Sequence, residues 1–434
     1  MTLLADLLTT VFDRRDRLAL LAKQVDRPLP ELAADLIGAE GEVTGLTVAQ
    51  QLLDGYGAAD DETKLAFFRH LAEEMTISPE AIRAALAAYE EGQSKASYRA
   101  YMDASEPPRQ ELIRRLNRVP GATRALVAMR TDLLRLGGDD DTLQALDLDF
   151  RHLFASWFNR GFLVLRPISW ESPAHILEKI IDYEAVHAIN SWRDLRSRLE
   201  PSDRRCFAFF HPAMPDEPLI FVEVALTQGI PGAIHAVLTD DRPRLIPQDA
   251  DTAVFYSISN CQAGLAGISF GNSLIKQVAA DLAHEWPGLK TFVTLSPIPG
   301  LVRWLSARNT PPAEGDDLRA QAAHYLLEAR RPDGQPLDPV ARFHLGNGAQ
   351  ILHLHADADR SDKGMAQSGG AMVNYLYDFE TVTQNHERYA ASREIAASSE
   401  IRGLAAAAEK AQKATDKTSR SARQNRTPDD TTTA

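Results

Sequence analysis

The sequence predicts an all-α helical domain followed by an α/β domain. Apolar residues recur at helical spacing up to about residue 155. Short β-branched and aromatic runs separated by helices and turns follow from residue 162. A chain of 434 residues is also too long for one ordinary domain. We therefore expect a helical domain at 1–157, an α/β domain at 158–394, and a frayed helix with a disordered tail at 395–434.

Composition excludes several classes of protein. Hydrophobic residues make up 44% and charged residues 25%, which are ordinary globular proportions. A net charge of −13 argues against nucleic acid as the main partner, because phosphate binding favours a basic surface. No apolar stretch has the length of a membrane helix, and two cysteines cannot form a disulfide framework. We expect a cytoplasmic protein without a nucleic-acid or membrane partner, in which Cys206 and Cys261 are buried thiols.

The first third contains helix signals but no recognisable chemical motif. Residues 2–24 are predicted to form an amphipathic helix. Ser78-Pro79-Glu80 is a typical helix start, because serine caps exposed amides and proline suits the first helical position. Gly92 provides the matching stop, and the acidic run 139–141 follows two glycines and is interpreted as a solvated loop. A scaffolding or assembly role is the preferred interpretation of this region.

Strands alternate with helices in the second region. The predicted strands are 207–210, 219–226, 253–259 and 291–296. Between the last two lie a glycine loop and a helix with Ile275, Val278 and Leu282 on one face. The order is therefore strand, glycine loop, helix, strand.

The glycine loop has the chemistry of an anion site. Gly264, Gly267 and Gly271 precede a helix N-terminus, where backbone amides and the helix dipole favour negative charge. Neither the P-loop pattern nor the dinucleotide-binding pattern is present. From the glycines alone, an ordinary turn between a strand and a helix is the favoured interpretation.

The wider pattern Gln262-x-Gly264-x-x-Gly267 resembles the loop with which GNAT acyltransferases hold the pyrophosphate of coenzyme A. The resemblance implies an α/β domain of GNAT type, with a mixed central sheet flanked by helices. It also implies that strands 253–259 and 290–296 separate to admit an acyl-pantetheine arm. The candidate residues of the coenzyme A loop are Gln262, Gly264, Gly267, Gly271 and Asn272.

Four longer stretches are more specific. They are Phe-Tyr-Ser-Ile-Ser at 255–259, Thr-Leu-Ser-Pro-Ile-Pro-Gly at 294–300, Arg-Phe-His-Leu-Gly-Asn-Gly-Ala at 342–349 and Gly-Ala-Met-Val-Asn-Tyr-Leu-Tyr at 370–377. Together they closely resemble the malonyl-CoA decarboxylase family, over roughly residues 160–385. The resemblance implies a helical assembly domain, a homotetramer, and conversion of malonyl-CoA to acetyl-CoA and CO2 in fatty-acid or malonate metabolism.

The same resemblance assigns site residues. It implies that Ser296 and His344 are catalytic, and that Ser257 and Tyr377 lie in the same active site. Asn347 is a further candidate for substrate binding. Some relatives carry an acidic residue at the position of Ser269, so no carboxylate role is transferred to that position.

The chemistry of the reaction agrees with the residues available. Loss of CO2 from malonyl-CoA leaves an enolate on the thioester, so the substrate supplies its own electron sink, and we expect no metal or organic cofactor. Ser296 precedes Pro297 at a predicted strand end. His344 is expected at the entry to a hairpin turn at 346–348. We hypothesise that this pair orients the malonyl carboxylate, that His344 helps to protonate the enolate directly or through water, and that Ser257 and Tyr377 donate to the carboxylate or thioester oxygen.

Other interpretations stay open. His353 and His355, with Asp357 and Asp359, contain metal-capable side chains, but a surface strand is favoured because no complete ligand set can be placed. An acyltransferase that transfers an acyl group to an amine would use the same frame. A non-catalytic acyl-CoA sensor, with the basic tail contacting an acidic partner, is a third possibility.

Overall fold

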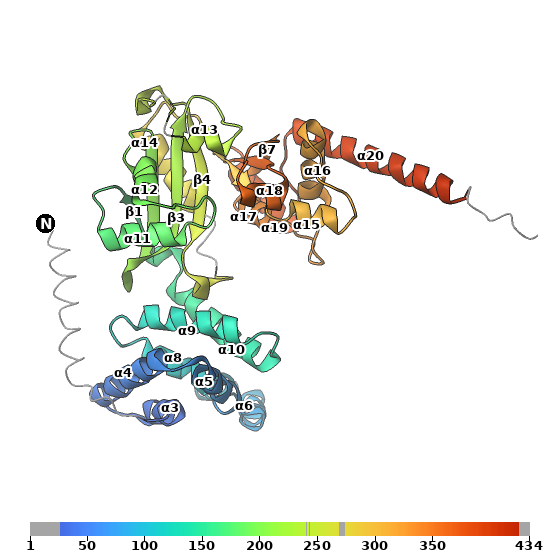
Figure 1. The fold of residues 1–434 in the computed structure, drawn as a ribbon. Coiled ribbons are helices and arrows are strands. Elements are labelled where there is room, and N and C mark those ends of the chain that lie inside the picture. The colour runs from blue at the N-terminus through green and yellow to red at the C-terminus, as the bar shows by residue number, and fades with distance from the viewer. Residues whose placement is uncertain (1–26, 240, 243, 269–273, 425–434) are drawn as a thin grey trace, which may run out of the picture. The chain divides into compact units, whose positions relative to one another are not determined.

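The computed structural model describes residues 27–239, 241–242, 244–268 and 274–424 (Figure 1). The chain forms two compact units. The first contains residues 1–164, 209–219 and 261–270, and the second contains the remaining segments. The helix expected at 2–24 and the end of the predicted tail, 425–434, lie outside the described residues.

The first unit is helical, as the apolar periodicity predicts. Its α-helices are α3 (Leu29–Gly38), α4 (Glu42–Ala58), α5 (Asp61–Glu73), α6 (Pro79–Glu91), α7 (Lys95–Ser105), α8 (Pro108–Leu116), α9 (Ala122–Leu136) and α10 (Asp141–Trp157). The predicted start of α6 is confirmed, because the Ser78 side chain accepts the Ala81 N–H and Pro79 takes the first helical position. In the acidic run, Asp140 caps α10 by accepting the Thr142 N–H.

An aromatic core holds these helices together. Phe67 and Phe68 of α5 are buried, as are Phe150 and Phe154 of α10. Arg109 is also buried, and its charge is paired. Its guanidinium pairs with Asp149 at 2.6 Å and donates to the Ala72 carbonyl at 3.0 Å. Loss of either partner would leave a buried charge uncompensated.

The glycine loop is packed against α9 within the same unit. Its short helix η3 (Ala263–Leu265) lies on α9, and Arg130 donates to the carbonyls of Gly264 and Ala266 at 2.7 and 2.9 Å. A Cβ atom at Gly264 would lie 2.0 Å from the Val127 carbonyl oxygen. Glycine is therefore required at 264 by packing alone.

The second unit is an α/β structure. Its helices are α11 (Ala174–Tyr183), α12 (Trp192–Leu199), α13 (Ile234–Leu238), α14 (Leu274–Glu285), α15 (Leu301–Ser306), α16 (Gly315–Glu328), α17 (Pro339–Gly346), α18 (Asp362–Ser368), α19 (Val382–Ser392) and α20 (Ser399–Gln424). A short 3₁₀ turn lies at Pro247–Asp249, and another lies in the first unit at Arg160–Phe162. The strands are β1 (Val164–Ile168), β2 (Arg204–His211), β3 (Met214–Thr227), β4 (Thr252–Asn260), β5 (Thr291–Thr294), β6 (Ser296–Pro297), β7 (Gln350–His355) and β8 (Met372–Leu376).

The strands form one mixed sheet in the order β1-β2-β3-β4-β5-β8-β6, with β7 paired to β8. Strands β4 and β5 pair in parallel, and the β3–β4, β5–β8, β6–β8 and β7–β8 pairs are antiparallel. Apolar side chains from β3, β4, β5 and α13 form its core. The predicted fold class, a helical region followed by a mixed sheet with helices, is confirmed.

The parallel strands β4 and β5 separate part-way along their length. Their register ends at Phe255 opposite Thr294, and the Leu295 N–H donates to the Phe255 carbonyl at 3.0 Å. Beyond this point the chain leaves β4 but keeps its pairing with β8, from Val293 opposite Leu376 to Ser296 opposite Val373. The continuous strand predicted at 291–296 is therefore wrong at Leu295, because the chain leaves β4 there. The separation of the two strands expected from the GNAT resemblance is present.

Two composition-based expectations can be compared with the structure. Cys206 and Cys261 are buried thiols that form no disulfide with each other, as predicted. Over the described part of the chain, no helix has both the length and the apolar character needed to cross a membrane.

We predict that Gly264→Ala strongly destabilises the helical unit, by about 3 kcal/mol or more, because the added methyl group overlaps the α9 backbone. Gly57→Ala is the matched control, since its Cβ would meet no atom within 4 Å near the end of α4. It should be neutral or stabilising by up to about 1 kcal/mol. Urea denaturation measures both, and equal stability of the two variants would contradict this packing.

Candidate active site

Ser296, His344 and Tyr377 come together from three different elements. Ser296 begins β6, His344 lies in the last turn of α17, and Tyr377 directly follows β8. The Nε2 atom of His344 lies 3.2 Å from the Ser296 Oγ, and its Nδ1 atom lies 2.8 Å from the Tyr377 hydroxyl. One imidazole thus joins both hydroxyls.

The hairpin predicted around His344 is wrong. Asp338 caps α17 by accepting the N–H groups of Val340 and Ala341, and Pro339 occupies the first turn. The helix ends before Gly348, whose φ of +85° suits glycine and whose Cβ would lie 2.0 Å from the Val382 carbonyl. The glycines that resembled a hairpin turn therefore terminate a helix, and they hold His344 on a rigid element.

The site is almost closed to water. His344 is 2% exposed and Tyr377 is 1% exposed. The imidazole stacks on the Tyr375 ring, with centroids 4.4 Å apart and an interplanar angle of 21°. Burial lowers the pKa of His344 to about 3, and it raises the pKa of Tyr377 well above its ordinary value. The free site therefore contains a neutral imidazole and a neutral phenol at neutral pH.

The hydrogen-bond pattern assigns the protons. Ser296 donates to the Thr294 hydroxyl at 2.8 Å, so its own oxygen is free to accept. His344 then carries its proton on Nε2 and donates to Ser296, while Nδ1 accepts from Tyr377. The direction of donation therefore runs from Tyr377 to His344 to Ser296 to Thr294.

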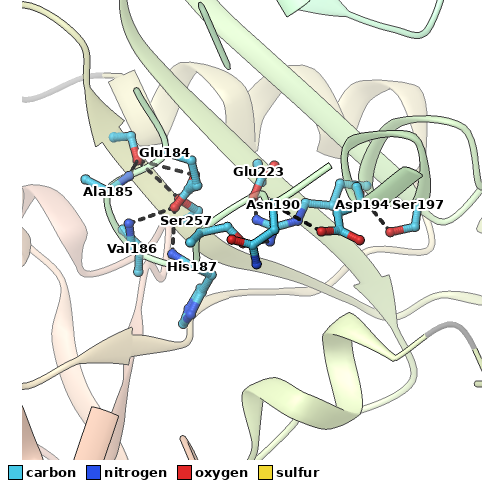
Figure 2. Close-up of polar contacts among 12 residues, drawn as sticks. Glu184, Ala185, Val186, His187, Asn190, Asp194, Ser197, Glu223 and Ser257 are labelled. Atoms are coloured by element: carbon cyan, nitrogen blue, oxygen red, sulfur yellow. Dashed lines mark hydrogen bonds and ion pairs between the residues drawn. The ribbon is translucent and has the colours of Figure 1, made fainter. Parts of the chain in front are cut away.

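Ser257 lies on β4 beyond Phe255, the last residue in register with β5. Phe255 pairs with Val224 of β3, whereas Ser257 pairs with Glu223, because β4 has a bulge between them. Phe255 and Ser257 therefore face opposite sides of the sheet. The Ser257 hydroxyl donates to the carboxylate of Glu184, as Figure 2 shows.

The remaining candidates have hydrogen-bond partners other than Ser296, His344 and Tyr377. The Asn347 amide donates to the Phe343 carbonyl at 2.7 Å and caps α17, so its role in substrate binding stays a prediction. His353 contacts Glu400 at 2.7 Å and His355 contacts Asn374 at 2.6 Å. The two histidines thus have different partners, and among the described residues no group of three or more potential ligands could hold a metal ion.

The candidate coenzyme A loop is described in part. The Gln262 amide donates to the Pro218 carbonyl at 3.1 Å, and Gly267 has a φ of +74°. The guanidinium of the exposed Arg151 lies beside Gly267, within 3.6–3.8 Å of where its Cβ would be. Gly271, Asn272 and Ser269 lie outside the described residues.

Three residues of the site were missed by sequence reasoning. Thr294 accepts from Ser296 and could have been found from the period of two within its own strand. Tyr375 lies in the quoted stretch but was treated as packing. Glu184 comes from a loop more than seventy residues before Ser257 and had no signal in the sequence.

Comparisons with known proteins agree on one family. Sequence models of the malonyl-CoA decarboxylase C-terminal domain match residues 161–316 and 313–416, and the model of its N-terminal domain matches residues 76–158. The chain belongs to the malonyl-CoA decarboxylase family. The expectation of a carboxy-lyase is thereby confirmed, and Ser257, Ser296, His344 and Tyr377 all lie inside the matched C-terminal domain.

Individual malonyl-CoA decarboxylases support this membership. The mitochondrial enzyme of Anser anser anser is 34% identical over an alignment of 348 residues, and the match covers 68% of this chain and 69% of the relative. The crystal structure of the Rhodopseudomonas palustris enzyme has 48% identity and a TM-score of 0.82, covering 86% of this chain and 98% of that one. The Agrobacterium vitis enzyme has 47% identity and the same TM-score, covering 87% and 99%.

We predict that His344 makes folding sensitive to acid. Its pKa is about 3 when folded and near the ordinary 6.5 when unfolded, so between these values the unfolded chain binds more protons and stability falls as pH falls. Relative to His344→Gln, the wild type should lose about 2 kcal/mol of unfolding free energy between pH 7 and pH 5. Urea titrations at both pH values measure this, and a constant difference would show that His344 is not a neutral buried group.

Proposed function

We propose that this chain converts malonyl-CoA to acetyl-CoA and CO2 through Ser296, His344 and Tyr377. The support is the buried chain of hydroxyl, imidazole and hydroxyl beside the point where β4 and β5 part. In the reaction, the bond between the carboxylate carbon and the α-carbon breaks, and its electron pair moves into the thioester as an enolate. One proton then adds to the α-carbon. The thioester carbonyl accepts the electron pair, so the chemistry requires no metal or organic cofactor.

A neutral donor suits this reaction better than a cation. A charged imidazolium would bind the malonyl carboxylate tightly in the ground state and would oppose loss of that charge as CO2 leaves. On binding, the malonyl carboxylate would replace the Ser296 oxygen as the acceptor of the His344 Nε2–H. This neutral N–H would orient the carboxylate by a weaker hydrogen bond than an imidazolium would. The low exposure of the site also removes water from the carboxylate, which favours its departure as uncharged CO2.

Departure of CO2 leaves an enolate beside His344, and its α-carbon requires one proton. His344 passes its Nε2 proton to the α-carbon, directly or through water, while the Tyr377 hydroxyl proton moves to Nδ1. Tyr377 regains a proton from solvent as acetyl-CoA leaves. In the free site the Ser296 oxygen holds this same N–H in place.

The coenzyme A moiety is assigned to the glycine loop. Gly267 adopts a left-handed conformation, and Arg151 places a cation beside it. Both features favour a pyrophosphate, and the pairing of Arg130 with the loop carbonyls fixes its shape. Gln262, Gly264, Gly267, Gly271 and Asn272 remain the proposed residues of this subsite.

The proposed assembly is a homotetramer formed through the helical unit. Helices α6 and α7 contain no buried residue, and they expose Leu86, Tyr98 and Met102. Unpartnered apolar side chains of this size are typical of association surfaces. Cytoplasmic localisation stays a prediction.

We predict that Ser296→Ala and His344→Gln each lower kcat for malonyl-CoA by about 100-fold or more, because His344 bonds the carboxylate and delivers the proton, and Ser296 positions the imidazole. Tyr377→Phe should cost about tenfold, since it removes one neutral hydrogen bond to His344. Mass spectrometry of acetyl-CoA and CO2 measures turnover, and calorimetry with coenzyme A should show unchanged binding.

His175→Gln on the exposed side of α11 is the control for these variants and should retain full activity. Wild-type turnover in both the Ser296 and His344 variants would remove the pair from the mechanism. Intact malonyl-CoA with the wild type, together with amine-dependent release of thiol, would instead indicate acyl transfer.

We predict a solution mass of four times the 47.8 kDa chain by light scattering. Replacing Tyr98 and Met102 together by Glu should reduce this mass, because charge is introduced into exposed apolar positions of α7. A monomeric wild type would contradict the proposed assembly, and an unchanged mass in the variant would exclude α7 from the interface.

A further inference from the structure

Tyr375 on β8 is a fully buried residue that the mechanism above does not use. Its neighbour two positions earlier, Val373, pairs with Ser296 in the antiparallel register. Because side chains alternate along a strand, Tyr375 projects from the same face of the sheet as Ser296. The Tyr375 N–H donates to the Thr294 hydroxyl at 3.2 Å, and the same hydroxyl accepts from Ser296. The backbone of Tyr375 is thus fixed within the catalytic cluster.

The ring of Tyr375 covers one face of the His344 imidazole. The two ring centroids lie 4.4 Å apart, and the interplanar angle is 21°. The rings of Phe343 and Tyr377 also lie against the imidazole, but at 77° and 72° to its plane. Of these three rings, Tyr375 alone is nearly parallel to the imidazole. Such a ring resists tilting of the imidazole, because tilting would bring closely packed atoms into overlap.

Both hydrogen bonds of His344 change during the proposed reaction. In the free site, Nε2 donates to Ser296 and Nδ1 accepts from Tyr377. During turnover, Nε2 exchanges Ser296 for the malonyl carboxylate and then gives its proton to the α-carbon, while Nδ1 takes the proton of Tyr377. Each bond therefore changes its partner or its direction. The contact between the two rings involves no proton, so it is preserved through these steps.

The contact uses the aromatic ring of Tyr375 and not its hydroxyl. Among the residues that the structure describes, the buried hydroxyl has no hydrogen-bond partner. Burial raises the pKa of Tyr375 well above its ordinary value, so the phenol is neutral. The face of an aromatic ring carries partial negative charge. It therefore attracts the partial positive charge that the imidazole gains as Nδ1 takes up a proton.

We propose that Tyr375 is a positioning residue for the decarboxylation, whose ring holds the plane of the His344 imidazole while it passes a proton to the α-carbon. This inference rests on the proposed function. Tyr375 acts only through His344, and its role requires no contact with the substrate. Because proton delivery depends on the placement of the donor, the effect belongs to kcat rather than to KM.

Two substitutions separate the ring from the hydroxyl. Tyr375→Leu removes the ring and keeps an apolar side chain, and it should lower kcat by about 100-fold, as expected for a displacement of about 1 Å at the reacting group. KM for malonyl-CoA should stay within about threefold of the wild type. Tyr375→Phe keeps the ring, so kcat should also stay within about threefold. Mass spectrometry of acetyl-CoA measures all three quantities.

Tyr256→Leu on β4 is the matched control for loss of a buried tyrosine. Tyr256 is 1% exposed and, like Tyr375, has a hydroxyl without a partner among the described residues. It packs in a core cluster with Leu295, which alternates with Ser296 and so faces the opposite side of the sheet. Both Leu variants should unfold at lower urea concentration than the wild type, because each leaves a cavity. Only Tyr375→Leu should lose kcat.

A double variant tests whether Tyr375 acts through His344. Once His344→Gln has removed the imidazole, adding Tyr375→Leu should change kcat by no more than about threefold. A further loss of about 100-fold in the double variant would show a purely structural role and overturn the proposal. An equal loss in Tyr375→Phe and Tyr375→Leu would assign the effect to the hydroxyl and also overturn it, as would wild-type kcat in Tyr375→Leu. Failure of the wild type to decarboxylate malonyl-CoA would refute the proposed function instead.

Discussion

The cluster of Ser296, His344 and Tyr377 depends on the point where the chain leaves β4 and keeps its pairing with β8. Up to Thr294 the chain shares hydrogen bonds with β4, and its pairing with β8 runs from Val293 to Ser296. Because β8 pairs with β5, β6 and β7, a single strand aligns the serine, the phenol and the strand that follows the His344 helix. The pairing with β8 therefore brings together three side chains from different elements.

Burial, rather than ion pairing, sets the protonation states of His344 and Tyr377. The imidazole of His344 is neutral because desolvation alone lowers its pKa, and the phenol of Tyr377 stays protonated for the same reason. The charged groups of this unit lie elsewhere, in the contacts of Glu184 with Ser257 and of Arg198 with Glu223. Such a division suits a reaction in which a carboxylate must lose its charge, since a fixed cation at the carboxylate would stabilise the reactant more than the transition state.

The sequence was informative wherever a local signal decided the structure. The start of α6 followed from Ser78 and Pro79, and the fold class followed from the change from helical to strand periodicity. The pairing of Ser296 with His344 came only from the resemblance of long motifs, since nothing local relates residues 48 positions apart. The hairpin error at 346–348 has a physical cause: glycines end a helix and form a turn by the same left-handed backbone, and the deciding signal was the Asp338-Pro339 cap several residues earlier. Glu184 could not be predicted, because a lone glutamate in a loop has no periodicity and its partner is set by tertiary packing.

Other residues of the long motifs hold the segments that carry Ser296 and His344 in place. Asp338 is buried, and burial raises its pKa to about 6, yet it accepts the Val340 and Ala341 N–H groups at the start of the His344 helix. Gly300 lies at the end of the stretch that contains Ser296. Its N–H donates to the Asp338 carboxyl, and this hydrogen bond lowers the pKa of Asp338. Gly300 itself has no room for a side chain, because a Cβ would lie 2.0 Å from the Tyr325 hydroxyl. One buried carboxyl thus joins the two stretches that carry Ser296 and His344. Residues that never contact a substrate are therefore needed in both motifs, since a shift of either segment would lengthen the 3.2 Å contact between the serine and the imidazole.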